Sequence, residues 1–383
     1  MFDEVSIARA VDEVMKNIER VNQAYIQKIA NQINKIGQLN ASSINRITLM
    51  TEMGADIAEI TNQLRAATQL TEQQMMVIYQ RALDDMADDP RFSAALKHTE
   101  IKPEDTERIN QYARAVSMQT AQQIENLSNT TSLMPQYKDA VDKAILAVNT
   151  GLTDYRSATR DVIRDLGTNG MQVYYESGCH RRLDTAIRQN IIDGANQIAQ
   201  NCSDMMGEAL GYDAVEITAH AMSAPDHEPV QGRVFLKAEF EKMQNGSDFQ
   251  DIDGNSYEGF MRPIGEWNCK HFAMSFSTKY SKRKFTDEQL EQFAEANEKG
   301  CEIDGKHYTK FGASQLMRRI ETQVRREKDV ANAAKAAGDD VLRKQCQVRI
   351  NQLMQKYNKV AATANLKPHR ERTMVEGFRA VKA

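Results

Sequence analysis

Four side chains that can bind a metal ion occur in two segments of the sequence. His220 and His227 are separated by six residues, and Cys269 and His271 follow later as a Cys-x-His pair. Imidazole and thiolate are the ligands that zinc prefers, and four of them could close a tetrahedral site. The spacing matches no standard zinc pattern, which favours the alternative of buried polar side chains that hydrogen-bond loop backbone. We therefore expect no cofactor, with zinc as the alternative.

Cys269 could also act as a nucleophile, because a neighbouring histidine can convert a thiol into a thiolate. The candidate bases are His220 and His271, and the candidate orienting carboxylates are Glu216 and Asp226. The sequence has no Walker loop, no His-Glu-x-x-His and no Gly-x-Ser-x-Gly motif. The sequence therefore lacks the motifs that are typical of ATPases, metalloproteases and esterases. We expect no catalytic residue, with a Cys/His enzyme as the alternative.

Two groups of arginines are candidates for charge recognition. Arg181, Arg182 and Arg188 accompany Asp184. At helical spacing Arg181 and Arg188 would share one face, with Asp184 a turn away. A buried Arg-Asp clamp that braces the fold is favoured over phosphate contact.

The second group lies in the basic C-terminal part of the chain. The pairs Arg318-Arg319 and Arg325-Arg326 are one heptad apart and would line one side of a helix. Residues 301–383 hold 18 Lys and Arg against 9 Asp and Glu, whereas the whole chain has a net charge of -4. Such a face could follow a DNA backbone without reading bases. An ordinary solvated helix face is the equal alternative.

The elements that position these residues change in kind along the chain. Residues 1–150 contain only Gly37 and Gly54 among 19 glycines, and apolar residues recur every three or four positions in Val11–Ile36. This pattern predicts a long amphipathic helix. Further helical stretches are predicted over Ile44–Leu64 and Thr71–Met86, so residues 1–150 should form an elongated helical region. Pro90, Pro103 and Pro135 fit turns or first helical turns.

An α+β module is predicted for residues 151–310. Residues 153–210 read as helix, with the arginines on a helix approached through Ser177-Gly178. Asp213–His220 alternates between apolar and polar residues, which indicates a half-buried strand. Arg233–Leu236 is a second strand candidate, and Asp253-Gly254 and Asp304-Gly305 suit tight turns. A small sheet should follow the helices.

Residues 311–383 predict a helical hairpin. Leu316, Ile320 and Val324 step by four, and a second apolar stripe runs from Leu342 to Val360. Between them Gly338 can end the first helix and Asp339 can cap the next. The fold class expected is therefore mainly α with a small α+β module and a C-terminal helical hairpin.

Composition excludes several classes of protein. The chain of 383 residues is 41% hydrophobic and 27% charged, close to ordinary globular values. Charged residues crowd the first thirty positions and no long apolar run occurs, so neither a secretory signal nor a membrane partner is expected, and synthesis in a cytoplasm is expected. The five cysteines suggest neither a disulfide framework nor a zinc ribbon; they are Cys179, Cys202, Cys269, Cys301 and Cys346.

A family resemblance rests on three segments in order: Tyr174–Asn190, Glu216–Phe235 and Gly265–His271. The second contains a His-Ala segment, a Pro-x-His and a Gly-Arg-Val-Phe strand, and the third ends in Asn-Cys-Lys-His. The tail adds Tyr308-Thr309, Ser314-Gln315, Arg318-x-x-Glu321, Ala336–Asp339 and Glu371-Arg372. Together they resemble the tailed-phage minor capsid protein family of the phage minor capsid protein 2 type, and distantly the Mu-type head morphogenesis module. The resemblance covers about residues 150–380.

The resemblance implies a virion component in the head interior near the portal, active in head morphogenesis and in DNA packaging or ejection. Its implied partners are portal and major capsid proteins, with packaged double-stranded DNA as a further candidate. The alternative is an ejected enzymatic or toxin-like effector that uses the Cys/His site, because related modules are often joined to toxin domains.

Overall fold

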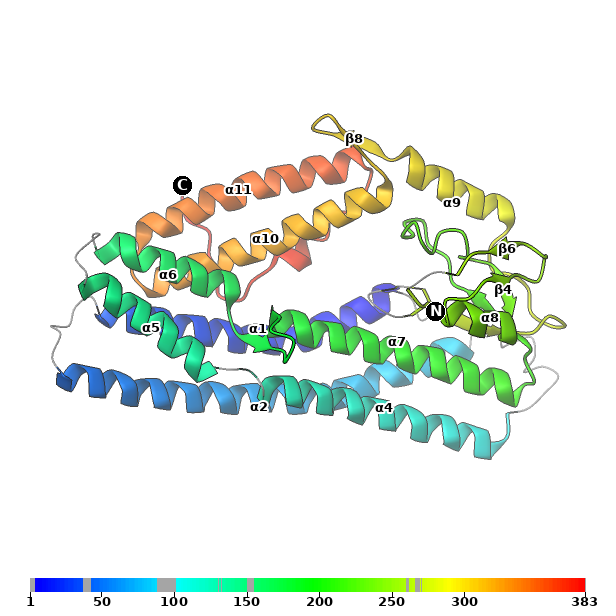
Figure 1. Cartoon of the computed structure of the whole chain (residues 1–383), viewed down its shortest axis with the longest axis horizontal. Helices are drawn as coiled ribbons and strands as arrows, with labels where there is room; N and C mark the ends of the chain where they lie inside the picture. The colour runs from blue at the N-terminus through cyan, green and yellow to red at the C-terminus, as the bar shows by residue number, and fades with distance from the viewer. Residues whose placement is uncertain are drawn as a thin grey trace. The chain divides into compact units, whose positions relative to one another are not determined.

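The computed structural model describes residues 4–36, 43–87, 101–129, 131, 133–149, 155–259, 262–265, 269 and 271–382. Within these residues the chain is mainly helical, with four small antiparallel sheets (Figure 1). The fold class predicted from the sequence is confirmed. Among the described helices none combines the length and apolar character needed to cross a lipid bilayer.

The residues form two compact units, each assembled from three stretches of sequence. The first unit consists of Met1–Asp12, Thr71–Gln123 and Gln189–Gly312, and the second of Glu13–Leu70, Ile124–Arg188 and Ala313–Ala383. These units do not coincide with the three consecutive regions 1–150, 151–310 and 311–383, whose status as domains stays a prediction.

Four helices are described before residue 150: α1 (Glu4–Ile36), α2 (Ser43–Ala87), α4 (Pro103–Asn129) and α5 (Leu133–Asn149). The predicted stripe on α1 is buried wherever its side chains are described, from Val11 to Ile33. The stretches predicted around Ile44–Leu64 and Thr71–Met86 are joined in α2 without a break. Pro103 opens α4 and Pro135 lies in the first turn of α5, as predicted, while Pro90 lies outside the described residues.

The next segment corrects the helix predicted over residues 153–210. Helix α6 (Tyr155–Asn169) is followed by a hairpin of β1 (Gln172–Tyr174) and β2 (His180–Arg182), and α7 (Leu183–Ala209) begins only after it. Gly178 has a φ of 81° in the loop between the strands, a conformation that glycine adopts without steric cost. Ser177-Gly178 therefore belongs to a hairpin turn and not to a helix approach.

The first unit contains a three-stranded antiparallel sheet in the order β4 (Val234–Leu236), β3 (Ala214–Ile217), β7 (Ala273–Phe276). Both predicted strands are present, but β3 is buried on both faces and not half-buried. Its Val215 and Ile217 pack into one apolar cluster, while Ala214 packs into a second. The alternating pattern therefore reflects two separate clusters on opposite faces of β3, with the buried Glu216 on the same face as Ala214.

Short elements complete the first unit. They are α8 (Lys237–Gln244), β5 (Phe249–Gln250), β6 (Ser256–Tyr257), α9 (Asp287–Lys299), β8 (Cys301–Ile303) and β9 (Lys306–Tyr308). Asp304 and Gly305 have φ values of 52° and 76° between β8 and β9. This is the left-handed hairpin turn that Asp-Gly predicts.

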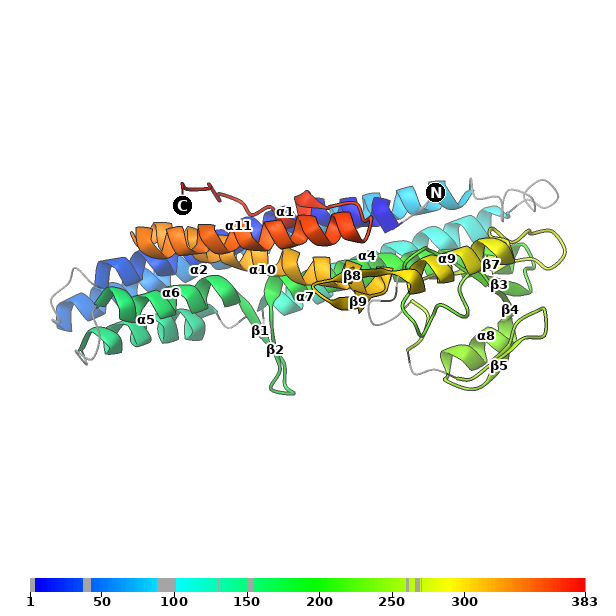
Figure 2. The ribbon, with the colours of Figure 1, turned by 90° about the horizontal axis from the view of Figure 1, so that it is seen from above.

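The predicted C-terminal helical hairpin is confirmed by α10 (Lys310–Ala336) and α11 (Asp340–Thr363), followed by the 3₁₀ helix η1 (Arg370–Thr373). The two long helices run side by side in both views (Figures 1 and 2). Gly338 has a φ of 72° at the reversal, and the Asp339 carboxylate accepts a hydrogen bond from the Leu342 amide. The sequence therefore located both ends of the turn.

Candidate functional site

The predicted metal ligands lie at one end of the sheet in the first unit. His227 belongs to the connection between β3 and β4, and Cys269 and His271 come directly before β7. The segments are joined just beyond the paired strands, where the Thr218 amide donates to the Phe272 carbonyl and the Phe272 amide donates to the Thr218 hydroxyl, both at 2.9 Å. The antiparallel register of β3 and β7 thus brings the histidines and the cysteine together.

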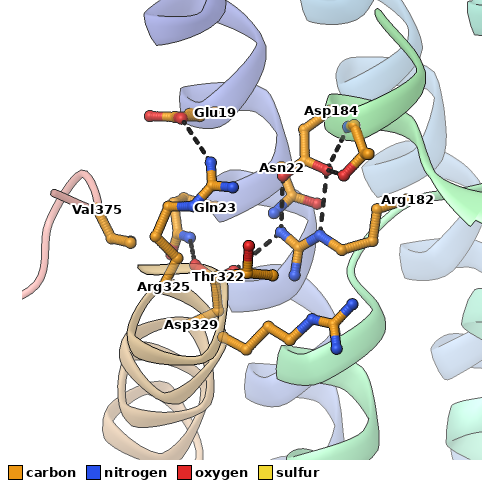
Figure 3. A pocket seen from close by; sticks show the side chains of 11 residues that line it. Glu19, Asn22, Gln23, Arg182, Asp184, Thr322, Arg325, Asp329 and Val375 are labelled. Atoms are coloured by element: carbon orange, nitrogen blue, oxygen red, sulfur yellow. Dashed lines mark hydrogen bonds and ion pairs between the residues drawn. The ribbon is translucent and has the colours of Figure 1, made fainter. Parts of the chain in front are cut away.

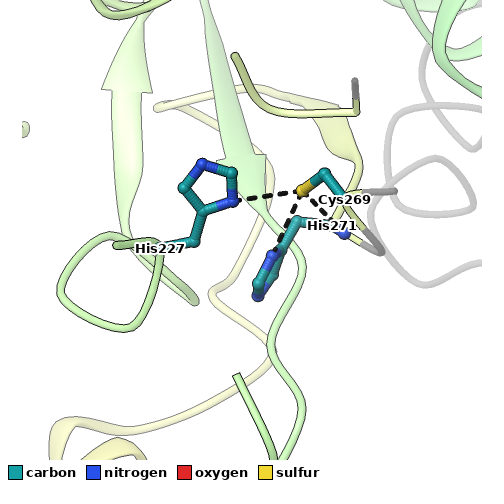
Figure 4. A group of neighbouring side chains, drawn as sticks. All are labelled: His227, Cys269 and His271. Carbon is teal, nitrogen blue, oxygen red and sulfur yellow. Dashed lines mark hydrogen bonds between the residues drawn. The ribbon is translucent and has the colours of Figure 1, made fainter. Parts of the chain in front are cut away.

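Three of the four predicted side chains converge on one point (Figure 4). The Cys269 Sγ lies 3.1 Å from the His227 Nδ1 and 3.5 Å from the His271 Nδ1. All three side chains are buried, with exposed fractions of 0%, 3% and 2% for His227, Cys269 and His271. We call these three residues the His/Cys cluster.

His220 is next to the cluster but does not direct a ring nitrogen into it. Its ring stacks on the ring of His271, with centroids 4.4 Å apart and planes 18° apart. The donor atoms that lie within 4.8 Å of one another come from His227, Cys269 and His271, and His220 is not in this group. The four-ligand arrangement considered from the sequence is therefore reduced to three.

The far side of each cluster histidine contacts a polar group. The His227 Nε2 donates to the Arg262 carbonyl at 2.8 Å, so the Nδ1 facing the sulfur carries no proton in the neutral ring. The His271 Nε2 lies 3.4 Å from the Ser223 hydroxyl, which itself donates to the Ala224 carbonyl.

An ion pair lies beside the cluster. The Arg262 guanidinium contacts Asp226 at 2.7 and 2.8 Å and lies 3.4 Å from the His227 Nδ1. Asp226, one of the orienting carboxylates considered for a nucleophile, is thus engaged with arginine. The other, Glu216, accepts a hydrogen bond from the Lys284 amide at 2.7 Å.

Burial governs the ionisation of the cluster. It raises the pKa of the Cys269 thiol, although the amides of Gly265 and His271 stabilise the thiolate in the opposite sense. Burial also lowers the pKa of His227. In the absence of a cation, a neutral thiol and a neutral imidazole are therefore favoured near neutral pH, the opposite of the thiolate–imidazolium pair that a cysteine nucleophile needs.

The first group of arginines belongs to the second unit, where the largely buried side chain of Arg182 lies between two carboxylates. The Arg182 guanidinium contacts Asp184 and Asp329 at 2.9 Å each and donates to the Thr168 carbonyl at 3.0 Å. Gln23 also donates to the Asp329 carboxylate. Figure 3 shows these side chains meeting from α1, β2, α7 and α10. We call Arg182, Asp184 and Asp329 the Arg/Asp cluster.

The two carboxylates of the Arg/Asp cluster ionise differently. Burial by itself raises the pKa of Asp184, but Arg182 more than compensates and the pKa falls to about 2. Burial raises the pKa of Asp329 to about 6, although Arg182 opposes the change. A single guanidinium therefore holds one carboxylate fully charged and leaves the other close to protonation.

The remaining arginines of this group lie apart. Arg181 is exposed on β2 and Arg188 is partly buried on α7. Because α7 begins at Leu183, the helical face that Arg181 and Arg188 were expected to share does not exist. The sequence analysis did not single out Asp329. The one sequence feature that marks this position is the run of mostly small residues that follows it, Val330–Ala334, which is buried in the structure.

The tail arginines divide into two pairs. Arg319 and Arg326 are exposed on α10, whereas Arg318 and Arg325 are partly buried. Arg325 lies 3.8 Å from Glu19, whose pKa burial raises to about 7 against the opposing charge of Arg325. The expectation that all four line one open face is therefore corrected to two, Arg319 and Arg326.

Comparison with known proteins gives one match that spans nearly the whole chain. A family model described as phage minor capsid protein 2 matches residues 6–361. No curated protein and no solved structure gives a significant match. The matched range takes in the His/Cys cluster, the Arg/Asp cluster and α10. The chain therefore belongs to the phage minor capsid protein 2 family and is a structural protein of a phage head.

Proposed function

We propose that this chain lies inside the phage head near the portal and acts in head morphogenesis and in DNA packaging or ejection. In this role it binds portal and major capsid proteins and makes non-specific contacts with packaged double-stranded DNA. Family membership supports the head location. The observation that carries the DNA contact is the exposed basic surface formed by Arg319 and Arg326 on α10 in the second unit.

This basic surface can bind phosphate without large rearrangement. Arg319 and Arg326 are exposed and one heptad apart on α10, and no carboxylate partner is described for either within the residues of the structure. Arginine and lysine that neutralise phosphates release counterions, so binding of this kind depends on salt and not on base sequence.

DNA binding by the full chain tests the proposal. The double variant Arg319→Ala/Arg326→Ala removes two phosphate contacts. The logarithm of its affinity should therefore fall less steeply with the logarithm of salt concentration, with a slope smaller in magnitude by about 2. The control is Arg114→Ala/Lys299→Ala, which removes the same charge from exposed positions of the first unit. Binding that does not change from about 50 to 200 mM salt, or that both double variants weaken equally, would exclude this surface as the DNA contact.

We further propose that the His/Cys cluster takes no part in covalent catalysis. The raised pKa and 3% exposure of Cys269 support this view, because a catalytic thiol needs thiolate character and access to substrate. Alkylation of the native chain near neutral pH should label the exposed Cys179 and leave Cys269 unmodified. Faster labelling of Cys269 than of Cys179 would support the effector alternative.

A further inference from the structure

We propose that the His227 Nδ1, the Cys269 Sγ and the His271 Nδ1 bind one zinc ion. The site goes beyond the proposed head function and does not depend on it. Its basis is the convergence of three buried donor atoms from two segments of the chain, all within 4.8 Å of one another (Figure 4).

The donor types and spacings fit zinc. Ideal Zn–S and Zn–N bonds of about 2.3 and 2.0 Å place sulfur and nitrogen roughly 3.5 Å apart in a tetrahedral site. The two sulfur-to-nitrogen distances in the cluster are 3.1 and 3.5 Å. Small side-chain movements would therefore suffice to bring the three donors to coordinating distance. Mixed thiolate and imidazole donors favour zinc over magnesium or calcium, which prefer oxygen.

The surrounding contacts orient both imidazoles for coordination. A metal-bound histidine usually donates its second ring N–H to a carbonyl or another polar group. The His227 Nε2 does so to the Arg262 carbonyl at 2.8 Å, and the His271 Nε2 faces the Ser223 hydroxyl at 3.4 Å. Each contact fixes the tautomer whose Nδ1 lone pair faces the sulfur.

Hydrogen bonding accounts less well for the same arrangement. The thiol of Cys269 has a single proton, so it can donate to one of the two Nδ1 atoms at a time. A zinc ion would bind all three donors simultaneously. On binding, the Sγ–H proton leaves to solvent and the thiolate takes its place in the coordination shell.

Nearby charges are compatible with a cation. The Arg262 guanidinium lies 3.4 Å from the His227 Nδ1, and Asp226 neutralises it through two contacts. The thiolate adds a negative charge at the site itself. With three protein donors, a water molecule would complete the tetrahedron.

Zinc at this position would connect two segments that are distant in sequence. The connection from β3 to β4 carries His227, and the segment before β7 carries Cys269, 42 residues later. The ion would fasten these segments at the end of the sheet, so we expect the loaded chain to unfold at a higher temperature than the metal-free chain.

The experiment uses the full chain, stripped of metal with a chelator, dialysed and then titrated with Zn²⁺ or Co²⁺. We expect equimolar zinc by elemental analysis and release of the thiol proton. Co²⁺ should give the near-ultraviolet charge-transfer band of a cobalt–thiolate bond, together with the visible spectrum of tetrahedral coordination. The wild-type spectrum tests the site without any variant.

Variants separate ligands from neighbours. Cys269→Ser and His271→Gln should lose equimolar zinc and the thermal shift, whereas Cys202→Ser, at a buried cysteine of α7, should keep both. His220→Ala should also keep zinc, because its ring stacks on His271 and lies outside the group of converging donor atoms. Wild type that binds no zinc or shows no cobalt–thiolate band, or zinc retained by folded Cys269→Ser, would overturn the proposal. Loss of zinc from folded His220→Ala would overturn the three-ligand assignment.

Discussion

At the scale of single residues, burial and pairing decide what each ionisable group can do. Arg182 balances the largely buried carboxylate of Asp184 and the buried carboxylate of Asp329, and without it neither would keep a positive partner at 2.9 Å. Breaking a buried pair by removing one partner is far more costly than losing an exposed charge. The neighbouring Arg181, exposed on β2, provides the comparison.

Replacing Arg182 should therefore destabilise the second unit strongly. We expect Arg182→Met to lower the free energy of unfolding by about 3 to 5 kcal/mol. Arg181→Met should change it by less than about 0.5 kcal/mol. Urea unfolding followed by circular dichroism measures both. Equal losses in the two variants would show that the Arg/Asp cluster does not brace the fold.

The raised pKa values of Asp329 and Glu19 predict a pH dependence. These groups have ordinary pKa values of 3.8 and 4.5, and burial raises them to about 6 and about 7 in the folded chain. The folded state therefore holds protons that the unfolded state has released, so the free energy of unfolding should fall as pH rises from about 4 to 7. The low pKa of Asp184, about 2, acts in the opposite sense only in stronger acid.

The free energy of unfolding, measured at about pH 5 and pH 8, tests whether stability falls as the pH rises. Asparagine cannot titrate, so Asp329→Asn should flatten the decline that wild type shows over this range. Asp340→Asn, an exposed carboxylate in the first turn of α11, serves as the control and should leave the decline unchanged. A wild-type chain that gains stability toward pH 8 would contradict the raised pKa values.

The sequence could identify these side chains only as far as local spacing extends. Arg182 and Asp184 are two residues apart, so their pairing was within reach. Asp329 lies on α10, 147 residues after Arg182 in the sequence. Likewise, the pattern singled out four zinc donors, but the stacking of His220 on His271 depends on tertiary packing. Residue type predicted the candidates, and the fold selected among them.

At the scale of elements, periodicity predicted the long helices because each buries a continuous apolar stripe. It failed at β1 and β2, which have three residues each. Strands this short show no alternation that can be distinguished from the end of a helix. Glycine presents a similar ambiguity, since the sequence does not show which helical glycine is needed for close packing.

Two helical glycines of the second unit should respond to alanine with opposite signs. A Cβ on Gly167 of α6 would lie 2.5 Å from the Val330 Cα, whereas a Cβ on Gly54 of α2 would meet nothing within 4 Å. We expect Gly167→Ala to cost about 1 to 3 kcal/mol through overpacking. Gly54→Ala should add about 0.5 to 1 kcal/mol through helix propensity. Thermal unfolding compares them, and a loss of stability in both would refute the distinction.

At the scale of the whole molecule, function follows from family membership and not from the fold alone. A mainly helical architecture with small sheets can serve many roles, and periodicity and composition predicted no more than that architecture. The ordered segments from Tyr174 to His271 supplied the resemblance, and the family match over residues 6–361 confirms it. The exposed arginines of α10 then suggest how such a head protein could contact DNA.

A cryo-EM reconstruction of purified, DNA-filled particles, refined without imposed symmetry at the portal vertex, tests the central claim most directly. We expect density for this chain inside the shell, beside the portal, with the Arg319 and Arg326 side of α10 facing DNA. Density on the outer surface, or particles that lack the polypeptide altogether, would contradict an interior structural role.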